Sequence, residues 1–106
     1  MYRALVVEDD PVIAREVENC LARWGIQAQG IEDFQDVLGA FARFAPHITL
    51  MDISLPFFNG YYWCERIRRS SAVPVVFLSS RADTADVVMA VNMGGDDYVT
   101  KPFSVD

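Results

Sequence analysis

The chain is short of cysteine and histidine and has no long hydrophobic run. Its two cysteines, Cys20 and Cys64, both fall in helix-like segments, so we interpret them as small core residues in a reducing cytosol rather than as a disulfide. No apolar run approaches the roughly 20 residues of a membrane-spanning helix, and Glu8 turns the N-terminus acidic too early for a signal peptide. We therefore expect a cytoplasmic protein without membrane insertion.

Basic residues are scarce as well. Nine Lys and Arg against 15 Asp and Glu give a net charge of -6, and Lys101 is the only lysine. Proteins that bind nucleic acid without sequence preference need a basic surface, which excludes that function for the chain as given. Hydrophobic residues make up 52% of the 106 residues, enough for the buried core of one domain. We therefore predict a single domain over residues 1–106.

Short β-rich runs alternate with amphipathic segments along the chain. The predicted strands are residues 3–8, 26–31, 47–51, 73–78 and 97–100. The predicted helices are residues 11–24, 34–44, 61–69 and 84–93. In the first helix, Asp9 or Asp10 can act as the N-cap, Trp24 shares the spacing of the apolar residues, and Gly25 ends the helix. This alternation predicts an α/β fold with a parallel sheet that is covered by helices.

Polar side chains follow four of the predicted strands at the point where each strand ends. They are Glu8, Asp9 and Asp10 after the first strand, Asp52 after the third, Ser79 and Ser80 after the fourth, and Lys101 after the fifth. Because ligands of such sheets bind outside the carboxyl ends of the strands, we expect these residues to form one site. Crowded carboxylates need a nearby cation, and oxygen ligands without His or thiolate favour Mg²⁺ over Zn²⁺.

A carboxylate beside a metal ion can also act as a nucleophile toward phosphorus and form an aspartyl-phosphate. Such a transfer depends on positioning and on neutralising the oxygens of the phosphoryl group. The Lys101 ammonium and the Ser79 hydroxyl are suited to contact two of these oxygens. The sequence therefore predicts phosphoryl transfer to Asp52, assisted by these two residues.

The chain resembles the receiver domains of two-component response regulators over essentially its whole length. The motifs that carry the resemblance are LVVEDDP, LMDISLP, PVVFLSS and GGDDYVTKPF. The resemblance implies a flavodoxin-like doubly wound fold, with a five-stranded parallel sheet in the order 2-1-3-4-5. The fifth helix of that fold is missing from the chain as given.

The resemblance also implies a role for each matching residue. Asp52 is then the phosphoacceptor, and Glu8 and Asp9 form the acidic pair. Mg²⁺ is the implied cofactor, bound by Asp9, by Asp52 and by the backbone carbonyl of Ser54. Such a domain is not an enzyme in the usual sense but a phosphoacceptor that assists its own phosphotransfer and dephosphorylation.

Two further residues match the part of the family that responds to phosphorylation. Ser79 corresponds to the switch hydroxyl and Tyr98 to the switch aromatic residue, while Lys101 corresponds to the lysine that contacts the phosphoryl group. The implied response is a change in the face from Ser79 to Tyr98.

The VTKPF ending and the GGDDY segment resemble the OmpR-type subgroup, and GYYWCERIR and FLSSR resemble regulators that respond to bacitracin and other antimicrobial peptides. This implies that residues 1–106 are the N-terminal part of a longer transcription regulator. The implied partners are a sensor histidine kinase and a second copy in a phosphorylation-dependent homodimer. DNA is contacted only through a missing C-terminal domain. We expect residues 1–106 alone to dimerise abnormally or aggregate.

Three other functions remain open at this point. A flavodoxin-like cofactor binder needs a phosphate cradle rich in Ser, Thr or Gly after the first strand, where this chain has Glu8, Asp9 and Asp10. An aspartate-nucleophile phosphatase normally has a second acid two residues after the nucleophile, where this chain has Ser54. A degenerate receiver acts by phosphorylation-independent protein contact, but here the acceptor, acids, hydroxyl and lysine are all present.

Overall fold

The computed structural model describes residues 2–79 and 97–100, with side chains through residue 78. The strands are β1 (Arg3–Val7), β2 (Gln27–Gly30), β3 (Ile48–Asp52), β4 (Val75–Ser79) and β5 (Asp97–Thr100). The helices of the described part are α1 (Pro11–Arg23), α2 (Val37–Phe44) and α3 (Gly60–Arg68). The predicted helix over residues 84–93 lies outside the described residues. Each predicted strand agrees with the structure to within two residues at either end.

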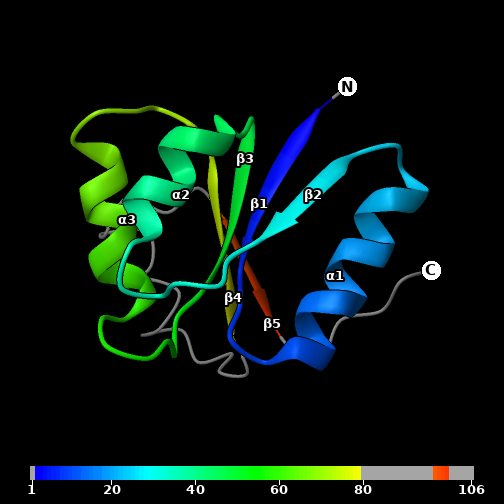
Figure 1. Ribbon diagram of the computed structural model, residues 1–106, viewed down its shortest axis with the longest axis horizontal. Coiled ribbons are helices and arrows are strands. Elements are labelled where there is room, and N and C mark those ends of the chain that lie inside the picture. The colour runs from blue at the N-terminus through cyan, green and yellow to red at the C-terminus, as the bar shows by residue number, and fades with distance from the viewer. Residues whose placement is uncertain (1, 80–96, 101–106) are drawn as a thin grey trace.

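All five strands form one parallel sheet in the order β2-β1-β3-β4-β5, which confirms the predicted fold class (Figure 1). The register places Val7 of β1 opposite Met51 of β3. Asp52 lies opposite Leu78 of β4, and Ser79 lies opposite Thr100 of β5. The carboxyl ends of β1, β3, β4 and β5 therefore lie along one edge of the sheet.

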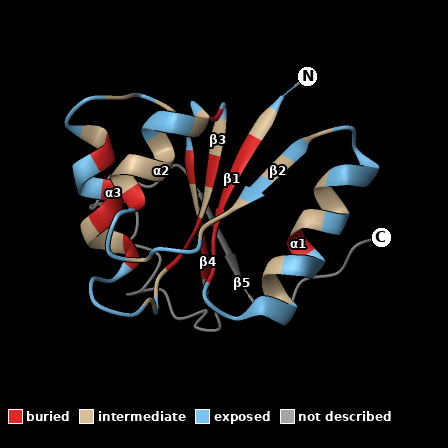
Figure 2. Ribbon diagram, viewed as in Figure 1, coloured by how far each residue is buried: buried red, intermediate tan, exposed pale blue. Residues whose placement is uncertain are grey.

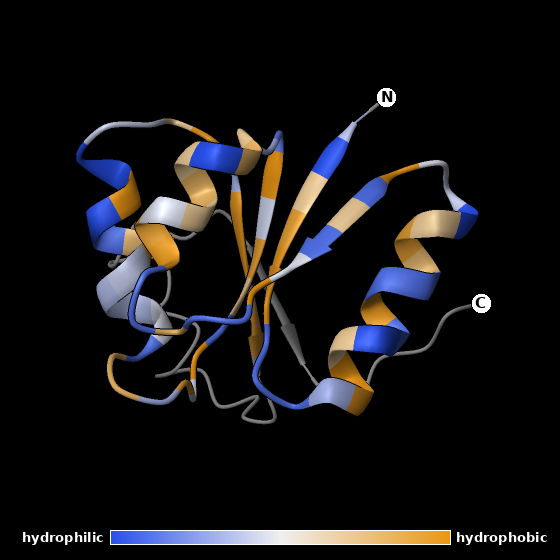
Figure 3. Cartoon of the chain, in the orientation of Figure 1, coloured by the Kyte–Doolittle hydropathy of each residue, from blue (hydrophilic) through white to orange (hydrophobic). Residues whose placement is uncertain are grey.

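Helices α2 and α3 cover one face of the sheet and α1 covers the other (Figure 1). The larger core cluster lies between the sheet and the α2–α3 side and includes Leu5, Met51, Ile67 and Phe77. A smaller cluster, centred on Val6, lies on the α1 side. Buried residues and hydrophobic residues both concentrate in the central strands (Figures 2 and 3). Among the described residues, no helix is both long and apolar enough to span a membrane.

Helix α1 begins at Pro11 because the Asp10 carboxylate caps it. The Asp10 Oδ1 atom accepts hydrogen bonds from the backbone N–H groups of Val12, at 2.9 Å, and of Ile13, at 3.4 Å. The helix ends at Arg23, and the positive φ of Gly25, 74°, turns the chain toward β2. The expectation that Trp24 belongs to the apolar stripe is wrong: this residue is the C-cap, and its side chain is 77% exposed.

Helix α2 begins at Val37, so the predicted start at residue 34 is wrong. The cause is Asp36, which has an extended φ of -129° and accepts a hydrogen bond from the Gly39 N–H at 3.0 Å, as an N-cap does. Phe34 precedes the helix but still packs against the larger core cluster. The Arg3 guanidinium donates to the carbonyl of Ala45 at 2.7 Å and so satisfies the end of the same helix.

The buried residues of α3 are spaced as expected for one face of a helix that packs against the sheet. Gly60, Trp63, Cys64 and Ile67 are buried, and the half-buried Tyr62 packs against the larger core cluster. Cys64 is fully buried in the larger core cluster, and Cys20 is half-buried. The interpretation of Cys64 as a small core residue is therefore confirmed.

Candidate functional site

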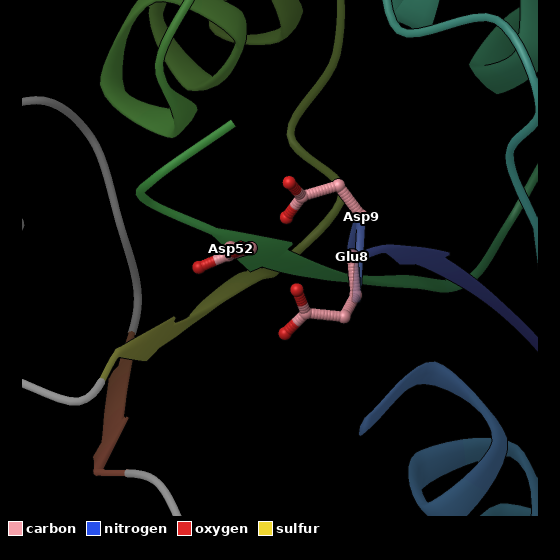
Figure 4. A group of neighbouring side chains, drawn as sticks. All are labelled: Glu8, Asp9 and Asp52. Atoms are coloured by element: carbon pink, nitrogen blue, oxygen red, sulfur yellow. The ribbon is translucent and has the colours of Figure 1, made fainter. Parts of the chain in front are cut away.

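Three carboxylates gather at the edge of the sheet where β1 and β3 end. Glu8, Asp9 and Asp52 each offer an oxygen, and these oxygens lie within 4.8 Å of one another (Figure 4). Within the described part of the chain, this is the only cluster of three or more Asp, Glu, His or Cys side chains close enough to share one metal ion. The predicted convergence of these acids is therefore confirmed.

The register of the sheet explains why the three residues meet. Val7 pairs with Met51, so the next residue on each strand, Glu8 and Asp52, lie beside each other at the strand ends. Successive side chains of an extended chain point in opposite directions. Figure 4 shows Glu8 and Asp9 leaving the end of β1 in different directions, with Asp52 between them on β3.

The cluster combines burial with like charge. Glu8 and Asp52 are each 4% exposed, whereas Asp9 is exposed. Two unit charges about 4 Å apart repel by about 4 kcal/mol in surroundings of intermediate polarity, and three such charges repel more strongly. An open groove of about 370 Å³ beside α1 and β2 reaches Glu8 and Asp9, so solvent and ions have access to the cluster. The cluster is therefore a candidate site for a cation.

The donor atoms identify which cations fit. All three side chains offer hard carboxylate oxygens, the ligands preferred by Mg²⁺, Mn²⁺ and Ca²⁺. The single histidine, His47, lies at the opposite end of the sheet, where its Nδ1 accepts a hydrogen bond from the Arg3 N–H at 2.9 Å. His47 therefore lies at the entrance of β3, away from the carboxylates. The site thus fits a hard divalent cation.

Backbone N–H groups orient the two buried carboxylates. The Ser54 N–H donates to Asp52 Oδ1 at 3.3 Å, and the Asp10 N–H donates to Glu8 Oε2 at 3.2 Å. Asp10 itself caps α1 and is not part of the metal-binding group. Ser54 thus lies next to the acceptor, and the role of its carbonyl as a metal ligand stays a prediction.

The other predicted site residues come from β4 and β5. The backbone of Ser79 ends β4 at the same edge of the sheet, and Thr100, opposite it, ends β5. Lys101 follows Thr100 in the chain but lies outside the described residues, as do the side chains of Ser79 and Tyr98. The roles of Ser79, Tyr98 and Lys101 therefore stay predictions.

One residue at the site was missed by sequence reasoning. Gly60, the first residue of α3, is buried against the backbone of Asp52, and its N–H donates to the Ile53 carbonyl at 2.9 Å. In the sequence, the Asn59-Gly60 pair indicates only a turn. The Asn59 side chain does cap α3, accepting from the Tyr62 N–H at 3.0 Å, but a sequence pattern cannot show which backbone a glycine approaches.

Comparison with known proteins agrees with this fold. Residues 4–106 match the response regulator receiver domain family. The chain is 45% identical over 106 residues to the transcriptional regulatory protein YvcP and 42% identical to the sensory transduction protein BceR, both of Bacillus subtilis (strain 168). These matches cover the whole chain but 45% and 46% of the two relatives, so the chain spans about half their length.

A solved structure of a response regulator domain has the same fold as this chain. The N-terminal domain of the nisin resistance regulator NsrR, described as a lantibiotic response regulator, superposes with a TM-score of 0.89 at 40% identity. The match covers 99% of this chain and 89% of that one. The fold and the family match together define a signalling receiver domain. This chain belongs to the response regulator receiver domain family, as its motifs predicted.

Proposed function

We propose that this domain is a phosphorylation-activated switch whose phosphoacceptor is Asp52. The observation that carries the proposal is the position of Asp52: it ends β3, is 4% exposed, and lies within 4.8 Å of two further carboxylates. Burying an acid is costly to the fold, and acids kept in such places concentrate at functional sites. Membership of the receiver family supports chemistry at phosphorus.

In the proposed reaction an oxygen of the Asp52 carboxylate attacks the phosphorus of a phosphorylated donor. A bond forms between this oxygen and phosphorus, and the bond between phosphorus and the donor breaks, with its electron pair leaving on the donor. The Ser54 N–H, donating to Asp52 Oδ1, holds the carboxylate in one orientation during the attack. The protein is thus a reactant that helps its own phosphorylation rather than a catalyst that turns over many substrates.

Glu8, Asp9, Asp52 and the Ser54 carbonyl are the groups that we propose for Mg²⁺. The fit rests on three hard oxygen donors that lie within 4.8 Å of one another. When bound, Mg²⁺ supplies positive charge that offsets the negative charge of the phosphoryl oxygens. We propose that Lys101, the only lysine, contacts another phosphoryl oxygen. We propose that the Ser79 hydroxyl responds to the bound phosphoryl group and that Tyr98 moves with it.

The biological partners follow from the family and stay proposals. A sensor histidine kinase is the proposed donor, and the curated relatives, which are about twice as long as this chain, suggest a longer regulator. YvcP is named a transcriptional regulatory protein, so we propose that a separate C-terminal domain binds DNA. In that setting phosphorylation would favour a homodimer in the cytoplasm.

The test is incubation with acetyl phosphate, with and without Mg²⁺, followed by intact mass spectrometry. We expect one added phosphoryl group in the presence of Mg²⁺ and none in the presence of a chelator. Rapid, continuing release of inorganic phosphate without this adduct would instead identify a phosphatase. If the wild-type chain gains no phosphoryl group under any of these conditions, it acts as a degenerate receiver and the proposal fails.

A further inference from the structure

Gly60 occupies a place where no side chain fits. A Cβ atom built on this residue would overlap the carbonyl oxygen of Asp52 and lie 3.0 Å from the Cα of Ile53. The Gly60 N–H donates to the Ile53 carbonyl at 2.9 Å, which holds the first turn of α3 against this backbone. The start of α3 therefore packs directly on the backbone of the proposed phosphoacceptor.

The obstacle at Gly60 differs in kind from that at the other described glycines. A Cβ at Gly30 would meet the carboxylate of Glu18, and a Cβ at Gly39 would meet the carboxylate of Asp36. Both obstacles are side-chain atoms, which can move without displacing the main chain, although the Asp36 carboxylate also caps α2. The obstacle at Gly60 is main chain, so a side chain there must displace the backbone of Asp52, the start of α3, or both.

The backbone that would be displaced also holds the Asp52 carboxylate. The Ser54 N–H donates to Asp52 Oδ1 at 3.3 Å, and the Ile53 N–H donates to the Leu78 carbonyl of β4 at 3.3 Å. A shift of the Asp52 carbonyl therefore changes the direction of the Ser54 N–H. It also changes the distance between the Asp52 carboxylate and the two acids of β1.

We propose that Gly60 is a positioning residue for phosphorylation: its missing side chain lets α3 fix the Asp52 backbone so that the carboxylate faces Glu8 and Asp9. This inference rests on the proposed function of Asp52. Misplacement of a reacting group by about 1 Å can cost about 100-fold in rate. Loss of an outer contact to a metal site costs about 10- to 100-fold in affinity.

The test compares Gly60→Ala with two controls. Asn59→Ala removes the α3 cap and weakens the same helix without touching the contact between Gly60 and Asp52. Gly39→Ala adds the same methyl group in α2, against a flexible side chain. For each variant, the rate of phosphorylation by acetyl phosphate is measured by intact mass, the Mg²⁺ affinity by calorimetry, and the fold by circular dichroism in a stabilising osmolyte.

For Gly60→Ala we expect a folded chain whose phosphorylation is about 10- to 100-fold slower. Its Mg²⁺ dissociation constant should be raised about 10-fold. The amide resonance of Ser54 should shift in its NMR spectrum. Both controls should keep the wild-type phosphorylation rate and Mg²⁺ affinity, although Asn59→Ala should unfold at a lower urea concentration than the wild-type chain.

Three outcomes overturn the inference while leaving Asp52 as the acceptor. They are a Gly60→Ala chain that is phosphorylated at the wild-type rate, an equal loss of rate in Asn59→Ala, and a Gly60→Ala chain that is unfolded even in the osmolyte. The last contradicts it because the proposed displacement is confined to residues 52–54 and the start of α3 and leaves the rest of the core in place. If the wild-type chain gains no phosphoryl group in the same experiment, the proposed function is refuted, and the inference with it.

Discussion

Val7 and Met51 face each other across β1 and β3, and this pairing fixes the geometry of the whole site. Each is fully buried, and the residue that follows each of them is an acid, Glu8 or Asp52. A slip of either strand by one residue would draw Glu8 or Asp52 further into the apolar interior, where burying a carboxylate is costly. The same burial that stabilises the core therefore holds two carboxylates side by side.

The first prediction concerns the exposed member of the cluster. Asp9→Asn removes one of three negative charges, so we expect the Mg²⁺ dissociation constant to rise about 10-fold or more. Asp10→Asn is the matched control, because the neighbouring acid caps α1, lies outside the cluster, and asparagine caps equally well. Calorimetry with MgCl₂ measures both. Equal weakening in the two variants would show that only net charge matters.

The second prediction isolates the structural role of Asp10. Asp10→Ala should lower the free energy of unfolding by about 1 kcal/mol, because the N–H groups of Val12 and Ile13 lose their acceptor. Asp10→Asn should recover most of that loss. Urea denaturation of the three chains gives the comparison. A loss in the asparagine variant as large as in the alanine variant would mean that charge, not capping, stabilises this end of α1.

The third prediction concerns Thr49, a buried polar residue of β3. It is fully buried, and its Oγ1 has no hydrogen-bond partner among the described residues. Thr49→Val keeps the shape and removes the unsatisfied hydroxyl, so we expect the free energy of unfolding to rise by about 1 kcal/mol. Thr49→Ala, which leaves a cavity in the same place, should lower it. A valine variant less stable than wild type would reveal a partner for the hydroxyl in solution.

Much of the fold could be predicted because the strands carry strong local signals. The buried runs of β1, β3 and β4 are almost continuously apolar, and the acids that follow β1 and β3 mark where these strands end. The convergence of Glu8, Asp9 and Asp52 then follows from parallel topology. The errors at Phe34 and Trp24 have one cause: helix ends are set by capping, which hydrophobic spacing does not report.

The contact between Gly60 and Asp52 could not be predicted from the pattern. An Asn-Gly pair indicates a turn, but only the path of the chain shows that α3 returns to the backbone of its own preceding strand. Within the same loop, Phe57 has a φ of 70°, which a bulky residue rarely adopts. Long-range packing imposes such local conformations, and it lies outside what local sequence can report.

The most direct measurement compares wild type and Asp52→Asn after incubation with acetyl phosphate and Mg²⁺. Asparagine keeps the shape of the side chain and removes the nucleophilic oxygen of a residue that is 4% exposed at the end of β3. Asp10→Asn, altered the same way outside the cluster, is the control. Intact mass spectrometry should show one added phosphoryl group on wild type and on Asp10→Asn, and none on Asp52→Asn. A Mg²⁺-dependent phosphoryl group gained by Asp52→Asn at the wild-type rate would contradict the assignment of Asp52 as the acceptor.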